Sequence, residues 1–440
     1  MIPILKPKVD IIAELKSEEM EPVDLIVYGA YATIKKNTSL ELKRIDKENN
    51  NVEKRRKRLL NVTLESGHLS VLDQAVYSIY ISDIPRLATM FMVQPIFMSH
   101  LQQSMRRVEP YGVYLPDEIR EAEVLKTMDE SIDLYYKMVD DDIPKEDARY
   151  VIPLYTSTNI QSVGNLREIT HLHLISQQPG VPKVCREIVN SIVDKINSFS
   201  PDLIRNYGEN FNILKYYPMP NIFRFEETIV DRLADNGLER KLLGYTQLID
   251  IDEEDLYRAL KEKRYPYLMQ LRNNTYNVIV KMSFSAFHQA IRQRTLNHIP
   301  ESIYHALERF DITIPPSIAR SRYKDRFIEM VKKLYKIYMD KAKTEEEKTL
   351  YVGVVSHAHN IYDIVRLDGW NIVGSLPTRR CIKAQWEIRR VVGNMILEVK
   401  KVNDVLPKYS LPGCITFGRC PEKYPCEYKD EFEAKGPLIK

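Results

Sequence analysis

The sequence lacks the features that define several large classes of protein. Only 15 of its 440 residues are glycine, which disfavours a glycine-rich linker protein. Hydrophobic residues make up 44% and charged residues 28%, and these ordinary proportions exclude disorder as the main state. The formal net charge is only +3, so the chain as a whole has no strong attraction to nucleic acid or to an anionic membrane.

Long apolar runs are also missing. No stretch approaches the roughly 18 residues needed to cross a bilayer. The first residues, MIPILKPKVDIIAELKSEE, lack the basic region, long apolar core and cleavage site of a signal peptide. We therefore expect a cytoplasmic protein. Its length suits two domains of roughly 200 residues each.

Cysteine is scarce, and an odd number in a large intracellular chain does not indicate a disulfide framework. Cys185 stands alone, and we expect it to be a small buried residue. The others are Cys381, Cys414, Cys420 and Cys426. The last three are evenly spaced and lack the C-x-x-C pairs typical of zinc and iron–sulfur sites. We expect no metal site but a tail with free thiols or one disulfide, and a metal site is the alternative.

A long internal repeat is present. Two segments about 200 residues apart carry apolar residues at helical spacing: Val124, Met128, Ile132 and Tyr135, then Phe327, Val331, Leu334 and Tyr338. Alternating runs near residues 78 and 279 predict half-buried strands upstream of these helices. A serine and a Glu-Ile pair recur in the same order, as Ser104 and Glu187-Ile188, then Ser302 and Glu387-Ile388.

This order indicates a tandem duplication. We expect a first copy over residues 1–212, a second over 213–405, and a C-terminal tail over 406–440. Each copy mixes helix and strand without regular βαβ alternation, which favours an α+β fold of a mostly antiparallel sheet packed with long helices.

A charged run ends in Lys54–Arg58. It could be a nucleic-acid patch, but a solvated helix face is the simpler interpretation. The common phosphate-binding loops, G-x-G-x-x-G and G-x-x-x-x-G-K-[ST], are absent, as are G-x-S-x-G and H-E-x-x-H. What remains is a set of Arg, Gln, Ser and Asn residues at matching places in both halves, and these residue types bind phosphates and carbonyls.

Four segments resemble the motifs of the flavin-dependent thymidylate synthases. SGHLSVLDQ, from Ser66, is similar to the family's G-H-x-S-V-L-E-H, and IPKEDARYVIP, from Ile143, to its R-E-x-A-R-x-V-L-P. In the second half, HQAIRQRTLNHIPES, from His288, is similar to H-Q-L-V-R-H-R-x7-S, and AQWEIR, from Ala384, to the same motif of the family. The motifs stand in the family's order in both copies.

This resemblance implies that dUMP is methylated at C5. Methylenetetrahydrofolate would supply the carbon, and FAD reduced by NADPH the hydride. The chemistry belongs to the flavin, so no catalytic side chain is expected, and the protein mainly binds and orients. Members of the family are homotetramers with FAD and dUMP between chains. A homodimer of this chain would form the corresponding pseudo-tetramer.

The first copy keeps one part of the family's residues. The resemblance implies cofactor binding by His68, Ser70, Asp73, Asn165 and Arg167, and substrate binding by Gln102, Gln103, Ser104, Arg106 and Arg149. The R-H-R position has become Gln94-Pro95-Ile96, and two further positions are Phe91 and Ser176.

The second copy keeps the other part. Here the resemblance implies cofactor binding by Arg292, Gln293 and Arg294, and substrate binding by Gln289, Arg292 and Arg379. The flavin histidine is missing from RYPYLMQ, and other positions of the motifs have become Tyr304, Leu350, Asp368 and Trp370.

The retained sets are close to complementary, which predicts a composite site with a Ser-loop side from the first copy and an R-x-R side from the second. Two chains would then carry two competent and two dead sites. Gln293, Arg107 and Pro300 depart from the family pattern. Two alternatives therefore stay open: an inactive scaffold for a protein or an RNA or ribosomal partner, and a flavoprotein that methylates another uracil-containing substrate.

Overall fold

A computed structural model describes residues 2–199, 203–204, 212–234 and 237–434. The chain divides into two compact units. The first unit contains Met1–Phe225 and Pro315–Ser356, and the second contains Glu226–Ile314 and His357–Lys440. None of the helices in the described ranges is long and apolar enough to cross a membrane.

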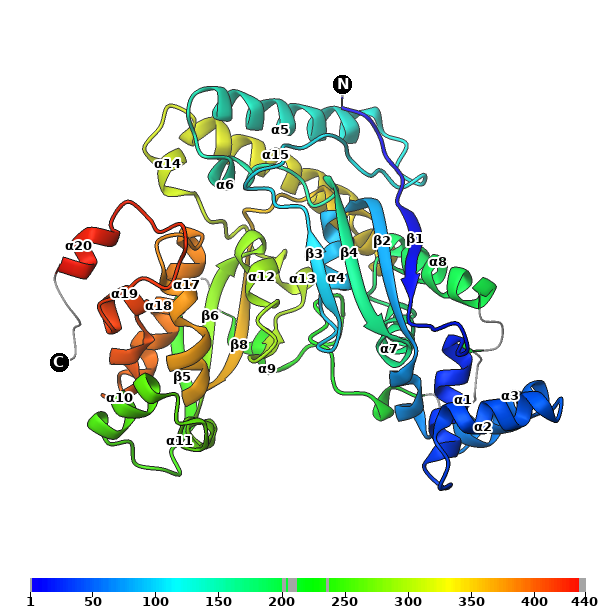
Figure 1. Ribbon diagram of the computed structural model, residues 1–440. Coiled ribbons are helices and arrows are strands. Elements are labelled where there is room, and N and C mark those ends of the chain that lie inside the picture. Colours follow the sequence, from blue (N-terminus) through cyan, green and yellow to red (C-terminus); the bar gives the residue numbers. More distant parts are fainter. Residues whose placement is uncertain (1, 200–202, 205–211, 235–236, 435–440) are drawn as a thin grey trace. The chain divides into compact units, whose positions relative to one another are not determined.

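The first unit is built on a four-stranded antiparallel sheet in the order β1-β2-β4-β3 (Figure 1). The strands are β1 (Lys8–Glu14), β2 (Val76–Pro85), β3 (Ser99–Gln102) and β4 (Ser157–Asn165). Along β2, Tyr77, Ile79 and Ile81 are buried and alternate with less buried residues, which confirms the predicted strand. The register of β1 against β2 shifts between Ile11 and Ala13.

Helices surround this sheet. They are α1 (Pro22–Ala32), α2 (Ser39–Glu48), α3 (Val52–Glu65), η1 (Leu69–Gln74), α4 (Arg86–Met92), α5 (Ala122–Asp140), α6 (Lys145–Ala148), α7 (Leu166–Ser176), α8 (Lys183–Phe199), η3 (Ile213–Lys215), α14 (Pro316–Ala319), α15 (Lys324–Lys341), α16 (Glu345–Tyr351) and η5 (Val352–Val354). Cys185 lies in α8 and is buried, as expected.

The second unit repeats the sheet, with four antiparallel strands in the order β5-β6-β8-β7. The strands are β5 (Arg240–Thr246), β6 (Thr275–Ser283), β7 (Asn297–Pro300) and β8 (Asn360–Asp368). The helices are α9 (Ile229–Leu233), α10 (Glu253–Glu262), α11 (Tyr265–Gln270), η4 (Leu271–Asn273), α12 (Phe284–Ala290), α13 (Ile303–Ala306), η6 (Asn371–Ser375), α17 (Pro377–Arg380), α18 (Trp386–Val399), η7 (Leu406–Ser410), α19 (Gly413–Thr416) and α20 (Lys429–Ala434).

The two sheets confirm the α+β fold and the tandem duplication. Their strand orders are equivalent. The register of β5 against β6 shifts between Leu242 and Gly244, at the place in the sheet where β1 shifts against β2. A bulge at the same point of two sheets is a specific feature that unrelated domains do not share by default.

The two long amphipathic helices, α5 and α15, pack against each other within the first unit (Figure 1). Their predicted apolar faces are both buried. Tyr323 donates its hydroxyl to Asp141 Oδ2 at 2.6 Å, and Lys341 Nζ lies 3.0 Å from Glu121 Oε1. The helix from the second copy therefore belongs to the compact unit of the first. The boundary between residues 212 and 213 divides the two predicted copies in the sequence, not the two compact units. Its exact position stays a prediction.

Glu387 joins α18 to the end of β6. Its carboxylate is fully buried and accepts hydrogen bonds from Ser283 N at 3.0 Å and Ser283 Oγ at 2.6 Å. The A-Q-W-E-I-R segment thus holds the helix on the sheet of the second unit.

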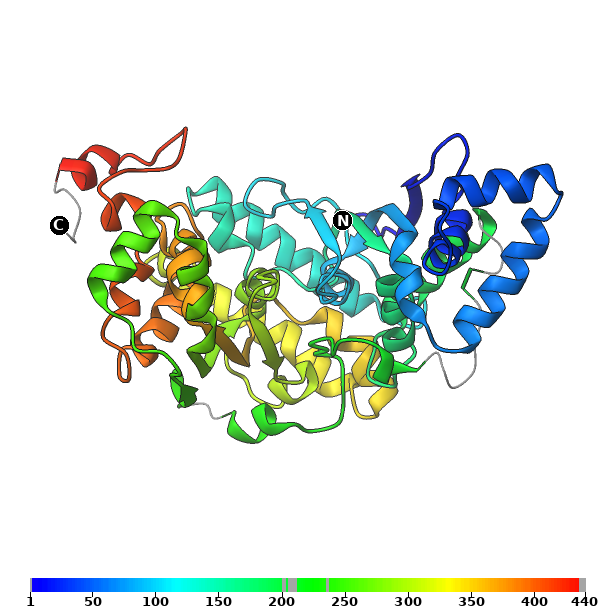
Figure 2. The same ribbon diagram turned by 60° about the horizontal axis from the view of Figure 1, so that its bottom comes forward.

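The basic run at Lys54–Arg58 lies on α3, which packs with α1 and α2 at the blue end of the chain (Figure 2). Arg55 Nε is 2.8 Å from Asp46 Oδ2, and Arg56 Nε is 2.8 Å from the buried Asp24 Oδ1. The hydrogen bond from Arg55 lowers the pKa of Asp46. Two charges of the run are thus used inside the fold, which favours the helix-face interpretation over a nucleic-acid patch.

Candidate active site

One group of predicted cofactor residues lies where β4 meets α7. Asn165 is the last residue of β4, and its side chain caps α7 by accepting from Glu168 N at 2.9 Å. Arg167 Nη1 lies 3.5 Å from Asp73 Oδ2, and its Nη2 donates to Lys215 O at 3.1 Å. The structure therefore brings Asp73, Asn165 and Arg167 together at one corner of the first unit.

His68 and Ser70 lie on the turn that leads into the same corner. Gly67 precedes His68 with φ of 75°, a left-handed conformation that glycine adopts without strain. This residue lets the chain reverse between α3 and η1. His68 and Ser70 are both exposed, so their side chains are accessible to a ligand.

The predicted substrate residues of the first copy follow β3. Gln102 Nε2 donates to Thr89 Oγ1 at 2.9 Å, whereas its buried Oε1 has no partner among the described residues. Gln103 is fixed by a hydrogen bond from Asn159 N to its Oε1 at 3.1 Å. The Ser104 hydroxyl oxygen accepts from Arg106 N at 3.3 Å and shapes the loop that follows.

Arg106 and Arg149 meet at Glu146, a residue that the sequence interpretation did not single out. Arg106 Nε lies 2.6 Å from Glu146 Oε2, and Arg149 Nε donates to Glu146 O at 3.0 Å. Arg149 is almost fully buried and lines a pocket together with Gln103 and Tyr135. Three predicted substrate residues, Gln103, Arg106 and Arg149, are thus brought together around this pocket and Glu146.

These two groups lie toward opposite ends of β4. The Ser loop contacts Asn159, and the cofactor group is at Asn165. Six residues of strand span about 20 Å. A small ligand cannot touch both groups, so the first unit offers two separate contact regions.

The second unit gathers the R-x-R residues. Arg292, Gln293 and Arg294 form the turn after α12, and Arg379 comes from α17. With the Gln293 amide oxygen facing Arg379, that oxygen accepts from Arg379 Nη2 at 2.7 Å and also from its Nε. Asn371 Nδ2 donates to Thr295 O at 3.3 Å and ties the turn to the segment that carries Arg379.

The electrostatics of this arginine cluster suit an anion. Burial lowers the pKa of Arg292, and burial and the charge of Arg292 lower the pKa of Arg379. Two guanidinium groups are therefore held close together with part of their hydration removed. An anion placed between them would relieve both costs. Gln289 Nε2 donates to Ser285 O at 3.3 Å, one helical turn before the cluster.

The donor set fits a phosphorylated ligand and a flavin nucleotide. Arginine forks bind phosphate oxygens in pairs, and Gln102 and Gln289 can offer amide donors and acceptors to a base. Each unit holds only part of this donor set: Gln102 lies in the first unit, and Gln289 lies in the second.

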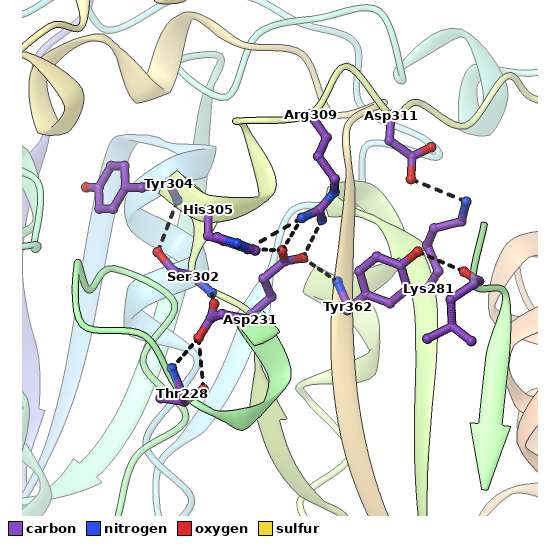
Figure 3. A network of polar contacts seen from close by, with 11 residues as sticks. Thr228, Asp231, Lys281, Ser302, Tyr304, His305, Arg309, Asp311 and Tyr362 are labelled. Atoms are coloured by element: carbon purple, nitrogen blue, oxygen red, sulfur yellow. Dashed lines mark hydrogen bonds and ion pairs between the residues drawn. The ribbon is translucent and has the colours of Figure 1, made fainter. Parts of the chain in front are cut away.

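The second Ser loop is closed by an internal polar network (Figure 3). Asp231 Oδ1 accepts from Ser302 N at 2.7 Å, and Ser302 Oγ accepts from Tyr304 N at 3.2 Å. Asp231 also accepts from both the backbone nitrogen and the hydroxyl of Thr228. The polar groups of this loop are thus satisfied within the protein.

Glu301 is the centre of the same network. Its fully buried carboxylate contacts His305 Nδ1 at 2.6 Å, Arg309 at 2.6 and 2.8 Å, and Tyr362 N at 3.0 Å. Among the described residues, Asp231, Glu301 and His305 form the group whose ligand atoms lie within 4.8 Å. The arginine already supplies the cation, so we interpret the group as structural. The spacing of Glu301, His305 and Arg309, four residues apart, is the sequence signal that could have revealed it.

The former R-H-R position of the first copy is also closed. Gln94 is 1% exposed, and neither atom of its side-chain amide has a hydrogen-bond partner in the described part of the chain. A side chain packed in this way does not reach solvent. The first copy is therefore closed at the R-H-R position, where the second copy keeps its arginines. The second copy is closed at the Ser loop, where the first copy keeps its polar residues.

Comparisons with known proteins agree with these motifs. The family model described as thymidylate synthase complementing protein matches residues 15–202 and 251–405. A flavin-dependent thymidylate synthase of Clostridium tetani is 31% identical over 159 residues, covering 32% of this chain and 64% of the relative. That of Sulfurisphaera tokodaii is 30% identical over 151 residues, covering 33% and 59%.

Other similar proteins are more distant or overlap less. The flavin-dependent thymidylate synthase of Pyrococcus furiosus is 33% identical over 134 residues, covering 28% of this chain and 53% of the relative. Among solved structures, the UMP/dUMP methylase PolB of Streptomyces cacaoi, bound with 5-Br dUMP, has 15% identity and a TM-score of 0.37, covering 45% of this chain and 93% of that one. The matches therefore span 53% to 64% of these three sequence relatives.

The two regions matched by the family model include most of both copies, and each copy carries the same four-stranded sheet. The chain therefore belongs to the thymidylate synthase complementing protein family, as a tandem duplication of its domain.

Proposed function

We propose that this protein is a flavin-dependent thymidylate synthase that methylates dUMP at C5 to give dTMP. Methylenetetrahydrofolate would be the carbon donor, FAD the cofactor and NADPH the source of electrons. The observation that carries the proposal is the cluster of Arg292, Gln293 and Arg379, where two guanidinium groups with lowered pKa converge. Membership of the family supports the choice of ligands.

In this proposal the second copy binds the anionic groups. Arg292 and Arg379 bind phosphate oxygens, Gln293 holds Arg379 in place, and Gln289 faces the uracil edge. Arg294 contributes to the cofactor side. Each charge-assisted hydrogen bond to phosphate is about twice as strong as a neutral one. The flavin, when bound, supplies the redox chemistry, and the side chains bind and orient.

The first copy provides the other side of the site. Gln102, Gln103, Ser104, Arg106 and Arg149 would contact the nucleotide, and His68, Ser70, Asp73, Asn165 and Arg167 the flavin. Arg106 must then exchange Glu146, now 2.6 Å away, for a phosphate oxygen. Because the two groups lie toward opposite ends of β4, the proposal assigns them to different ligands or to separate parts of one extended ligand.

We further infer that competent sites are composite and combine residues of both copies. A homodimer would supply four copies, as in the family's four-domain assembly. The closed second Ser loop and the buried Gln94 support this view, since both would belong to the dead sites.

The proposal is tested on the purified chain. We expect yellow protein that releases FAD on denaturation, binds dUMP, and releases tritium from C5-labelled dUMP when methylenetetrahydrofolate and NADPH are present. Omitting each co-substrate in turn is the control. Folded protein that stays colourless after incubation with FAD and does not bind dUMP would contradict the proposal and favour an inactive scaffold.

A further inference from the structure

Four of the five cysteines belong to one small region of the second unit. Cys381 follows α17, Cys414 lies in α19, and Cys420 and Cys426 lie between α19 and α20. None of these four residues is held in a disulfide, and all four are partly exposed. Even spacing groups the last three in the sequence, whereas Cys381 is 33 positions before Cys414.

Specific contacts bring the four cysteine-bearing segments together. Lys383, two residues after Cys381, donates its ammonium group to Tyr424 O, two residues before Cys426. Arg380 Nη1 donates to Ser410 Oγ at 2.6 Å and ties the residue before Cys381 to η7.

The chain also folds back between Cys414 and Cys420. A Cβ atom placed on Gly413 would lie 3.6 Å from Arg419 O and 3.7 Å from Pro421 Cδ. These two residues flank Cys420, so the segments that carry Cys414 and Cys420 lie side by side.

The thiols influence one another electrostatically. Burial raises the pKa of Cys414, and so does the proximity of Cys420, Cys381 and Cys426. All three other thiols are thus close enough to oppose ionisation of this one.

We propose that Cys381, Cys414, Cys420 and Cys426 together bind a thiophilic metal centre through four thiolates. Four cysteines are the complete ligand set of a structural zinc ion or of a four-iron, four-sulfur cluster. Three of the four lie beyond residue 405, where the match to the family model ends. Most of the proposed ligands thus lie outside the matched domain, while Cys381 lies inside it, two residues after Arg379.

The separation of the thiols favours the larger centre. In the described part of the chain, the only group of three or more possible ligands within 4.8 Å of one another is Asp231, Glu301 and His305. No three of the four cysteine sulfur atoms are therefore all within 4.8 Å of one another. Tetrahedral zinc at a Zn–S distance of about 2.3 Å requires sulfur atoms about 3.8 Å apart, whereas an iron–sulfur cube holds its cysteines more widely. Zinc binding would require the tail to close further.

The centre would fasten the C-terminal tail to α17. Cys381 lies two residues after Arg379, whose side chain is held by Gln293. A metal bound to Cys381 would thus fix the end of the short helix that presents Arg379. We assign the centre a structural role, with no electron transfer.

The test is metal and sulfide analysis of the full-length chain, purified without oxygen and reconstituted in parallel with iron plus sulfide or with zinc. We expect either about four iron atoms with equal acid-labile sulfide and visible absorption, or about one zinc ion. The replacements Cys414→Ala and Cys420→Ala should each remove at least half of the metal, while Cys185→Ala, outside the region, should retain it.

A thiol count separates the other outcomes and does not depend on how well the variants fold. In the wild-type chain, a thiol reagent should modify Cys381, Cys414, Cys420 and Cys426 only after a chelator or acid removes the metal. Four reactive thiols in untreated, reconstituted protein would overturn the proposal. So would a disulfide among them, or metal that is unaffected by both replacements.

Discussion

At the scale of single side chains, the two copies differ at equivalent turns. Arg292 and Arg379 are partly buried beside each other, whereas Gln94 at the equivalent turn of the first copy is enclosed. Gln293 stands where the family motif has histidine, and its amide oxygen accepts from Arg379. A neutral amide can hold one arginine without adding a charge to the cluster, so the substitution is compatible with anion binding.

The composite site predicts unequal effects of three replacements. Arg292→Ala and Arg149→Ala should each lower the rate of tritium release from C5-labelled dUMP by roughly 100-fold or more, because each removes charge-assisted bonds worth about 3 kcal/mol. Gln94→Ala should change the rate little, since its amide has no partner in the described structure. Equal losses for Gln94→Ala and Arg292→Ala would contradict complementary sites.

Matched controls separate binding from folding in this series. Arg272 and Arg322 are largely exposed, with 69% and 75% of their side chains accessible, so Arg272→Ala and Arg322→Ala should leave the rate unchanged. Arg149 is buried, and its variant needs a thermal unfolding measurement beside the rate. If Arg149→Lys keeps the fold but not dUMP binding, the guanidinium fork itself is required.

Part of the arrangement of the candidate site could be predicted from sequence, and the rest could not for physical reasons. Motif order identified Arg292, Gln293 and Arg379, which the structure brings together. It missed Glu146, because a glutamate within a charged segment gives no sign that it contacts Arg106 and Arg149. It also missed Cys381 as a partner of the tail cysteines, since chain distance says nothing about proximity after folding.

Among helices and strands, periodicity predicted what each element buries but not what it packs against. The apolar face of α15 is buried as expected, yet α15 packs against α5 of the first copy. An amphipathic helix specifies an apolar stripe, and equivalent helices of a duplicated domain carry similar stripes. Periodicity therefore predicted both helices, but it could not show which element each helix packs against.

The second Ser loop has become a structural element, which predicts a stability cost for Glu301→Gln. The change leaves Arg309 without its carboxylate in a buried setting, at a cost of roughly 3 kcal/mol in the free energy of unfolding. The measurement is the denaturant midpoint of the whole chain. Glu253→Gln is the control, because its ion pair with Lys408 is partly exposed and should contribute less than about 1 kcal/mol.

The pH dependence of this loss is a second readout of the same prediction. The hydrogen bond that His305 donates to the Glu301 carboxylate raises the pKa of His305, so protonated His305 stabilises the fold below its ordinary pKa of about 6.5. That contribution disappears as pH rises through the raised pKa. The difference between wild type and Glu301→Gln should thus be greatest near pH 6 and smaller near pH 9. A difference independent of pH would exclude a role for His305, which also faces Asp231 and Arg309.

For the chain as a whole, complementary loss predicts half the ligand capacity of two intact copies. If each competent site needs a Ser loop from a first copy and an arginine cluster from a second, every chain contributes to one site. Titration calorimetry with FAD present should then give one dUMP per chain, whatever the oligomeric state. Mixing Arg149→Ala chains with Arg292→Ala chains tests the origin of the two sides. If sites form across chains, mixed dimers should regain up to one intact site per dimer, and if they form within a chain, the mixture should stay inactive. Two dUMP per chain would contradict complementary loss, because the closed second Ser loop would then have to open and bind.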